Sequence, residues 1–168
     1  MSRADITSPC FILCNSRSRT TWLARFLCAG HEASAYASRF SDLYQYKVIV
    51  DTNIVNHYEI YKKEFPESRF YIMYRDVEDC LRSAKHDDVL KELNEDGIRS
   101  TDKNLRPLIN VLPNIEYSLL DDEEYLMMLY EEINGAPCPR WYVREFLLCK
   151  IETKTKEFFE TIGYEIPS

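Results

Sequence analysis

Short apolar runs alternate with segments of helical periodicity in the first half of the chain. The apolar runs have the length of strands and little polar alternation, which is typical of strands covered on both faces in a parallel sheet. They lie at Cys10–Cys14, Lys47–Asp51 and Arg69–Tyr74, and a further strand is predicted at His31–Tyr36. Strands that alternate with helices predict an α/β fold with a parallel sheet of about four to five strands between two helical layers.

The intervening segments carry helix signals. The predicted helices cover Thr20–Ala29 and Asn56–Phe65, and a third opens at Asp76, whose carboxylate suits an N-cap. Gly30 stands where a left-handed cap would end the first helix.

Beyond residue 86 the pattern becomes helical and loop-rich. The clearest helices there are predicted at Leu119–Ile133 and Arg140–Ile162, separated by Gly135-Ala136-Pro137. Acidic residues 121–124 are expected to form a solvated helix start. The sequence predicts one domain over 1–168, with a nucleotide-binding core at 10–85 completed by a helical region at 86–168.

Charge and cysteine content narrow the class of partner. A formal net charge of −7 leaves no broad basic face for a nucleic acid or an anionic membrane, so any bound anion has to meet a local group of arginines. The six cysteines form no C-x-x-C pair and no zinc-type spacing, which indicates reduced thiols and no metal site. No signal peptide or membrane span is evident at the N-terminus, and a cytoplasmic location is expected.

The main candidate for chemistry is the segment between the first strand and the first helix. It contains two arginines and three hydroxyl side chains, in the order Arg17, Ser18, Arg19, Thr20, Thr21, followed by Trp22. Backbone N–H groups at such a strand-to-helix turn bind phosphate or sulfate, and the arginines add charge and forked donors. Hydroxyls that only cap the helix, beside ordinary surface arginines, are the alternative.

The loop is not that of the nucleoside triphosphatases. Their motif requires glycines and a lysine, and no glycine occurs before Gly30. A P-loop kinase or nucleotidase is therefore the weakest of the functional hypotheses.

The loop resembles that of the sulfotransferase family, which binds the donor 3′-phosphoadenylyl sulfate through a strand, a Lys/Arg-Ser-Gly-Thr-Thr-Trp loop and a helix. The resemblance implies a P-loop-like core. It implies that Arg17 meets the bridging and sulfate oxygens, that Ser18, Thr20 and Thr21 bind the 5′-phosphate, and that Trp22 lies against adenine. Arg19 replaces the family's glycine and would need a left-handed backbone, as in the similar short phage-type members.

A second motif strengthens the resemblance. The family clamps the 3′-phosphate of its donor between an arginine at the end of a strand and a serine eight positions later, and Arg75 and Ser83 have that spacing. Both motifs fall at the carboxyl ends of strands, where open α/β sheets bind ligands. A surface arginine and an incidental serine are the alternative.

The catalytic base is less clear from the sequence. Asn53 stands where the cytosolic branch of the family has histidine, whereas the tyrosylprotein and heparan branches use a glutamate on the strand after the loop helix. By that resemblance Glu32 is the first candidate base, His31 the second, and Asp51 the third, with a role in orienting Arg17 as an alternative.

The resemblance covers about residues 11–83. The late Arg-Lys-Gly motif of the 3′-phosphate site is absent, and Arg99, Arg106 and Arg140 are candidates for the missing cation. Aromatic residues that could line an acceptor pocket are Tyr117, Tyr125, Tyr130, Trp141 and Tyr142.

Two main hypotheses follow. The first is a small soluble sulfotransferase that moves a sulfuryl group from 3′-phosphoadenylyl sulfate to an unknown small-molecule or protein acceptor, leaving adenosine 3′,5′-bisphosphate. The second, which Asn53 motivates, is a non-catalytic binder of a phosphorylated adenosine nucleotide.

Overall fold

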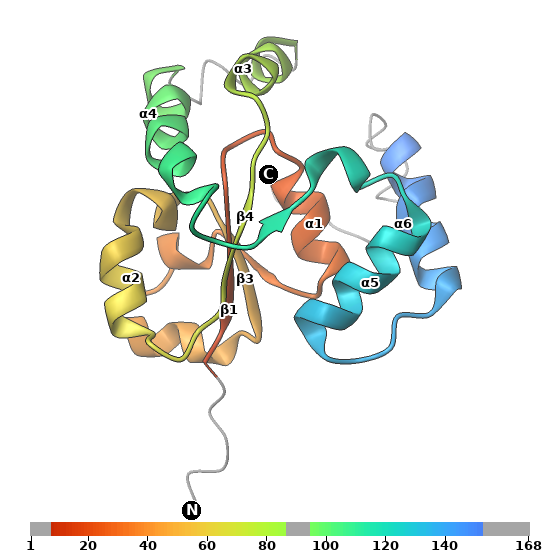
Figure 1. Ribbon diagram of the computed structural model, residues 1–168, viewed down its shortest axis with the longest axis horizontal. Helices are drawn as coiled ribbons and strands as arrows, with labels where there is room; N and C mark the ends of the chain where they lie inside the picture. Colours follow the sequence, from red (N-terminus) through yellow and green to blue (C-terminus); the bar gives the residue numbers. More distant parts are fainter. Residues whose placement is uncertain (1–7, 87–94, 153–168) are drawn as a thin grey trace, which may run out of the picture. The chain divides into compact units, whose positions relative to one another are not determined.

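The computed structural model describes residues 8–86 and 95–152 and has an α/β fold built on a sheet of five parallel strands (Figure 1). The strand order is β2-β3-β1-β4-β5. Their bounds are β1 Cys10–Cys14, β2 Gly30–His31, β3 Val48–Asp51, β4 Phe70–Met73 and β5 Asn114–Ile115. The predicted fold class and parallel sheet are therefore confirmed, and the sheet reaches the upper end of the expected size.

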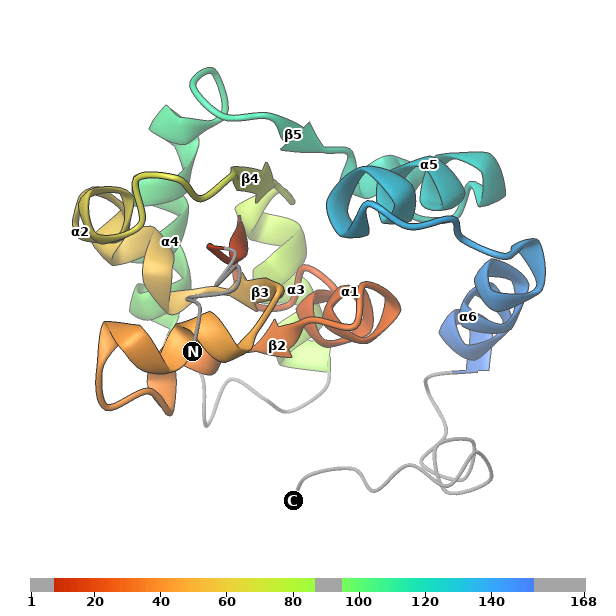
Figure 2. The same ribbon diagram turned by 90° about the horizontal axis from the view of Figure 1, so that it is seen from below.

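The helices follow the predicted strand–helix alternation. They are α1 Thr20–Phe26, α2 Tyr58–Glu64, α3 Val77–His86, α4 Glu95–Leu105, α5 Glu123–Asn134 and α6 Arg140–Glu152. Short 3₁₀ helices occur at Ala33–Ala35, Phe40–Gln45, Asn53–His57, Arg106–Leu108 and Tyr117–Leu119. Figure 2 shows the sheet with α1 on one side and α2 and α4 on the other.

The core lies on the three central strands. Every residue of β1, β3 and β4 is buried, as their continuous apolar sequences predict. Phe11 of β1 stacks on Phe70 of β4 with 5.0 Å between ring centroids, and Phe65 meets it edge-on at 5.1 Å. Buried aromatic side chains of this kind contribute roughly 1.5–3 kcal/mol each by leaving water, so this cluster anchors α2 to the sheet.

The chain divides into two compact units, residues 1–117 and 118–168. The first holds the whole sheet with α1–α4. In the second unit α5 packs against α6, and Glu123 pairs with Arg140 and Arg144.

Both ends of α5 agree with their sequence signals. The Asp122 carboxylate caps the helix by accepting a hydrogen bond from the Tyr125 backbone, and Gly135 ends it with a φ of 66°. The acidic run therefore does lie at a helix start, although Glu123 is engaged by arginines as well as by solvent.

Three predictions about elements were wrong. The second strand covers only Gly30–His31, because Glu32 turns into a left-handed conformation and a 3₁₀ helix begins at Ala33. Helix α1 ends at Phe26, and Cys28, at a φ of 55°, takes the left-handed position expected of Gly30.

A glycine at position 30 is required because the Tyr46 ring leaves no room for a side chain there. A Cβ atom there would lie 2.7 Å from the Tyr46 ring. The third error is β5, since no strand was expected at residues 114–115, in a region predicted to be helical and loop-rich. Residues 153–162 of the last predicted helix lie outside the described residues.

Candidate functional site

The carboxyl ends of β1 and β4 lie side by side, and the chain leaves these two strands toward opposite edges of the sheet. From β1 the chain passes through α1 to β2 at one edge, whereas from β4 it passes through α3 and α4 to β5 at the other edge. The loops after two such adjacent strands diverge and leave a crevice, which is where open α/β sheets bind ligands. The segment from Asn15 to Arg19 and the segment from Tyr74 to Asp76 therefore flank this position.

The loop after β1 is held in a strained conformation. Arg17 and Arg19 both have left-handed backbones, with φ angles of 65° and 59°. The left-handed Arg19 that the sequence required is thus observed. Such conformations cost about 1–3 kcal/mol in residues with a Cβ and persist only where the surroundings impose them.

Two side chains impose this shape. Asn15 is buried, accepts a hydrogen bond from the Ser16 backbone at 2.8 Å, and donates to the carbonyl of Ile98 in α4 at 2.9 Å. Ser18 is buried, and its Oγ lies 3.5 Å from the Cys80 sulfur on α3. The loop is therefore fixed to two helices that follow it far along the chain.

Three guanidinium groups gather around this loop. Arg75 donates a hydrogen bond from Nη1 to the carbonyl of Arg17, and its Cζ lies 5.0 Å from the ring centroid of Tyr117. The Cζ of Arg19 lies 5.4 Å from the same centroid. We call Arg17, Arg19 and Arg75 the arginine cluster.

The cluster concentrates positive charge in a half-buried place. Burial, and next the positive charge of Arg75, lower the pKa of Arg17. Both effects mean that the charged guanidinium is less favourable here than in water, and an anion between the arginines would relieve them. This arrangement can bind a phosphate or sulfate group.

The other predicted binding residues lie in different environments. Thr21 is exposed, whereas Thr20 is buried and its Oγ1 lies 3.1 Å from His31 Nε2. Trp22 is buried and stacks on Phe26 with ring centroids 5.5 Å apart. Ser83 is half-buried on α3, two turns into the helix that Asp76 caps through the backbone N–H groups of Glu78 and Asp79.

Glu32 is a partly buried carboxylate at the end of β2. Its side chain is 25% exposed, and its backbone is left-handed at a φ of 52°. Both oxygens accept from the Thr52 backbone, at 3.1 and 3.2 Å, and Oε2 also accepts from the Thr52 hydroxyl at 3.0 Å. Burial, followed by the negative charge of Asp51, raises the pKa of Glu32 to about 7.

Asp51 is fully buried and its oxygens accept four hydrogen bonds. Oδ1 accepts hydrogen bonds from the Ser34 hydroxyl at 2.9 Å and from the backbones of Asn53 and Ile54 at 2.9 and 3.1 Å. Oδ2 accepts from the Ser34 backbone at 2.9 Å. The carboxylate therefore ties the Ser34 turn to the end of β3 and caps the 3₁₀ helix that follows.

His31 links the loop helix to the carboxylates. Its Nε2 lies 3.1 Å from Thr20 Oγ1 and 3.9 Å from Glu32 Oε1. Burial is the main cause that lowers its pKa, so the ring is neutral near pH 7 and can accept as well as donate. Asn53 donates from Nδ2 to Ser34 Oγ at 3.4 Å.

The late arginines proposed as extra cations are engaged in surface ion pairs. Arg99 binds Glu78 at 2.8 Å and Glu95 at 3.0 Å, and Arg106 binds Asp102 at 2.7 Å. Arg140 pairs with Glu123 and Glu124. In the candidate aromatic set, Tyr117 lies against the arginine cluster, while Tyr142 contacts Tyr130 and Trp141 edge-on.

Sequence reasoning missed Asn15 and Thr52, and it expected Tyr117 in an acceptor pocket rather than beside the arginine cluster. Asn15 had a local signal, since a polar residue that directly follows a buried parallel strand lies at the ligand edge of the sheet. The other two act through tertiary contacts that no local pattern reveals.

Among the residues that the structure describes, Cys10, Cys14, Cys28, Cys80 and Cys138 form no disulfide bonds. Within residues 8–86 and 95–152, no three His, Cys, Asp or Glu side chains gather as a metal site. In the same part of the chain, no helix has the length and apolar character to cross a membrane. Comparisons with known protein families and with curated proteins found no match to this chain.

Proposed function

We propose that this chain is a small cytoplasmic sulfotransferase that uses 3′-phosphoadenylyl sulfate and modifies a hydroxyl or amine. The observation that carries the proposal is the arginine cluster at the carboxyl ends of β1 and β4. The helix that follows this loop contacts His31 through Thr20, and His31 lies beside Glu32, whose pKa is about 7. The strand order, with β1 central and followed by an anion-binding turn, is compatible with a P-loop-like core.

In this proposal the arginine cluster holds the two phosphate-bearing ends of the donor. Arg17 and the backbone N–H groups at the start of α1 bind the 5′-phosphate and the sulfuryl oxygens, together with Thr20 and Thr21. Arg75, with Ser83 on the following helix, binds the 3′-phosphate. Tyr117 keeps Arg19 and Arg75 close together through contacts of 5.4 and 5.0 Å.

Glu32 is the proposed general base. The acceptor oxygen or nitrogen attacks sulfur, its proton passes to the Glu32 carboxylate, and the bond from sulfur to the 5′-phosphate oxygen breaks. The products are the sulfated acceptor and adenosine 3′,5′-bisphosphate, on which Arg17 stabilises the new negative charge. A base with a pKa of about 7 is half ionised at neutral pH and is well matched to this task.

Asp51 is a weaker candidate base because its oxygens already accept four hydrogen bonds inside the protein. His31 is better placed to relay a proton or to orient Glu32, since it stands between Thr20 and that carboxylate.

The second candidate function is binding of the nucleotide without transfer. It is favoured by the three hydrogen bonds from Thr52 that occupy both oxygens of Glu32, and by Asn53 in place of a histidine. The arginine cluster would then sequester the nucleotide or present it to a partner.

Thermal unfolding with adenosine 3′,5′-bisphosphate, in the absence of magnesium, tests both candidates. A ligand at a hundred times its dissociation constant stabilises the folded state by about 2.7 kcal/mol, which raises the melting temperature of a chain of this size by roughly 5–10 °C. Stabilisation by ATP with magnesium alone would contradict both functions and favour a kinase.

Mass detection of transfer separates the two candidates. After incubation with 3′-phosphoadenylyl sulfate and a library of alcohols, phenols and amines, the first predicts a product heavier by one sulfuryl group. The product should disappear in Glu32→Gln and persist in His57→Ala, which changes an exposed histidine. Nucleotide binding without any such product would favour the second.

A further inference from the structure

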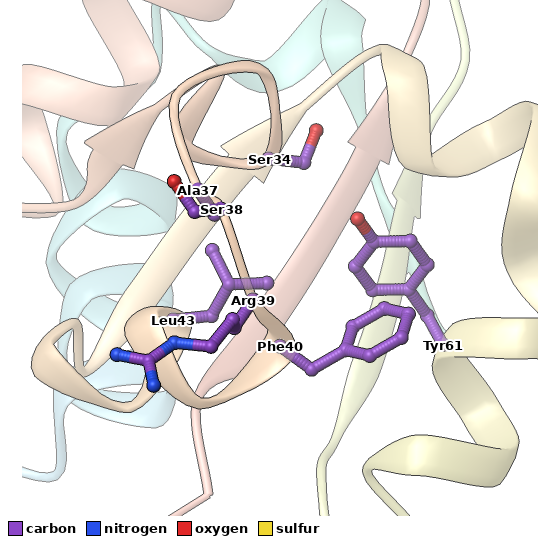
Figure 3. A pocket seen from close by; sticks show the side chains of 7 residues that line it. All are labelled: Ser34, Ala37, Ser38, Arg39, Phe40, Leu43 and Tyr61. Atoms are coloured by element: carbon purple, nitrogen blue, oxygen red, sulfur yellow. The ribbon is translucent and has the colours of Figure 1, made fainter.

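A cavity of about 250 Å³ lies between α2 and the segment that joins β2 to β3 (Figure 3). Its lining includes Ser34, Ala37, Phe40, Leu43 and Tyr61. The arginines of the arginine cluster are not among the residues that line it, so the cavity is separate from the proposed nucleotide site.

The walls of the cavity are largely apolar and fixed in place. Leu43 and Tyr61 are buried, and Phe40 meets the Tyr61 ring edge-on with 5.3 Å between centroids. Tyr61 also stacks on Phe65, which is part of the main core. Phe40 is 39% exposed, so the cavity is open to solvent on its side. Walls of this kind fit the faces of an aromatic or alicyclic ring.

One end of the cavity lies close to the proposed base. Ser34, which is at the opposite end from Phe40 in Figure 3, follows Glu32 by two positions in the chain. Ser34 donates to the Asp51 carboxylate from its backbone N–H and from its hydroxyl, both at 2.9 Å. The Glu32 carboxylate accepts from the backbone of Thr52, the next residue, at 3.1 Å. The Ser34 end of the cavity and the Glu32 carboxylate are therefore held at the same end of β3.

This arrangement sets the shape of a molecule that can both occupy the cavity and react. Its ring lies between Leu43, Phe40 and Tyr61, where the walls are apolar. Glu32 does not line the cavity, so the reacting atom has to extend beyond Ser34 to reach its carboxylate. A short chain between the ring and the reacting atom meets this requirement, whereas a group attached directly to the ring stays inside the cavity.

The charges around the cavity favour a neutral reacting group. Asp51 is buried at the polar end, and Glu32 adds a negative charge there when it is ionised. The guanidinium of Arg39 approaches Asp42 at 3.6 Å and in Figure 3 points away from Tyr61. A carboxylate on the ligand is therefore repelled. An alkyl amine is protonated at neutral pH, as lysine is, and then has no lone pair with which to attack, so an alcohol remains.

We propose that this cavity binds the acceptor of the transfer reaction, and that the acceptor is a neutral alcohol with one apolar ring on a short alkyl arm. This acceptor site rests on the proposed sulfotransferase function and adds the class of substrate to it. The size agrees, since a cavity of about 150 Å³ holds benzene, and drug-sized ligands need about 300 Å³ or more. The hydroxyl oxygen of the alcohol forms the bond to sulfur, its proton passes to Glu32, and adenosine 3′,5′-bisphosphate leaves.

Two probes of similar shape test the class of acceptor. 2-Phenylethanol has the ring, the short arm and the hydroxyl, and phenylacetate carries a carboxylate in place of the alcohol. With 3′-phosphoadenylyl sulfate, the wild-type protein should convert 2-phenylethanol to its sulfate ester, which is detected by mass. In NMR titrations phenylacetate should bind roughly tenfold more weakly than 2-phenylethanol because of its charge.

The variant Ala37→Leu tests the place of binding. Ala37 lines the cavity and packs against the main core, so a larger side chain there takes up space that the ring needs. The KM for 2-phenylethanol should rise roughly tenfold or more. The affinity for adenosine 3′,5′-bisphosphate, which also reports that the protein is folded, should not change. Ala35→Leu makes the same substitution at an exposed position two residues earlier and should keep the wild-type KM.

Phe40→Ala is a second variant, which removes a partly exposed wall without overfilling the cavity and should raise the same KM roughly fivefold. An unchanged KM in both cavity variants, equal affinity for the two probes, or transfer only to acceptors of another class would overturn the acceptor site and leave the proposed function intact. Failure of transfer to every acceptor would contradict the proposed function itself, and the acceptor site with it.

Discussion

The arginine cluster and the two carboxylates, Glu32 and Asp51, all lie at the carboxyl ends of the strands, but their charges have opposite kinds of surroundings. The arginines lie half-buried beside one another, and their mutual repulsion contributes to the lowered pKa of Arg17. The carboxylate of Asp51 accepts four hydrogen bonds from nearby residues of the protein. A charged side chain that is hydrogen-bonded within the protein stabilises the fold. Side chains of like charge that are held close together favour the binding of a ligand of the opposite charge.

Glu32 stands between these extremes. It accepts hydrogen bonds from Thr52, remains 25% exposed, and has a pKa near 7. We therefore propose that Asp51 stabilises the fold, that the arginines bind the ligand, and that Glu32 transfers a proton. Each assignment makes a separate prediction.

The largest expected effect is that of Asp51→Ala on stability. Four donors would lose their acceptor, and buried unsatisfied donors cost about 1–3 kcal/mol each before water compensates. We expect the free energy of unfolding, measured by urea denaturation, to fall by about 3–4 kcal/mol. Glu59→Ala, on the exposed face of α2, is the control and should change it by less than about 0.5 kcal/mol. Equal losses in both variants would remove the structural role of Asp51.

The next largest effect is a pH dependence of stability that originates from Glu32. Its pKa rises from 4.5 to about 7 on folding, so between these values the folded state binds more protons than the unfolded state. Stability due to this group is therefore present at low pH and lost as pH rises from about 4.5 to 7, by roughly 3 kcal/mol at about 1.4 kcal/mol per pH unit. Glu32→Gln should lack this loss when both proteins are denatured by urea across that range, and parallel profiles would contradict the raised pKa.

A smaller effect is expected for Tyr117, which contacts two of the arginines. Tyr117→Leu removes two cation–π contacts worth about 0.5–1 kcal/mol each, so the affinity for adenosine 3′,5′-bisphosphate should fall roughly five- to thirtyfold. Tyr117→Phe keeps the ring and should bind like the wild type in calorimetry. If both variants lost affinity alike, the hydroxyl rather than the ring face would be responsible.

The smallest effect concerns backbone strain. Arg19→Gly relieves a left-handed conformation and should raise the free energy of unfolding by about 0.5–1 kcal/mol while it weakens nucleotide binding. Arg25→Gly makes the same substitution within α1 and should cost about 1 kcal/mol. Destabilisation by both would show that Arg19 carries no strain.

The difference between the regions also explains how far the sequence could predict them. The loop from Arg17 to Trp22 and the arginine after β4 are local features at strand ends, so their positions at one sheet edge followed from the parallel topology. The separate roles of Glu32 and Asp51 could not be predicted, because burial and the contacts of Ser34 and Thr52 decide them. The predicted extent of the second strand was wrong for the same reason, since Glu32 has a left-handed backbone, is hydrogen-bonded to Thr52 and turns the chain out of the sheet.

Calorimetric titration of adenosine 3′,5′-bisphosphate and adenosine 5′-monophosphate into the wild type and Arg75→Ala tests the central claim most directly. We predict that the wild type prefers the bisphosphate by roughly 10–100-fold, as one charge-assisted contact to phosphate allows, and that Arg75→Ala abolishes most of this preference. Arg82→Ala, which removes an exposed arginine of α3, should retain the preference. An equal preference for the bisphosphate in the wild type and Arg75→Ala would contradict the account.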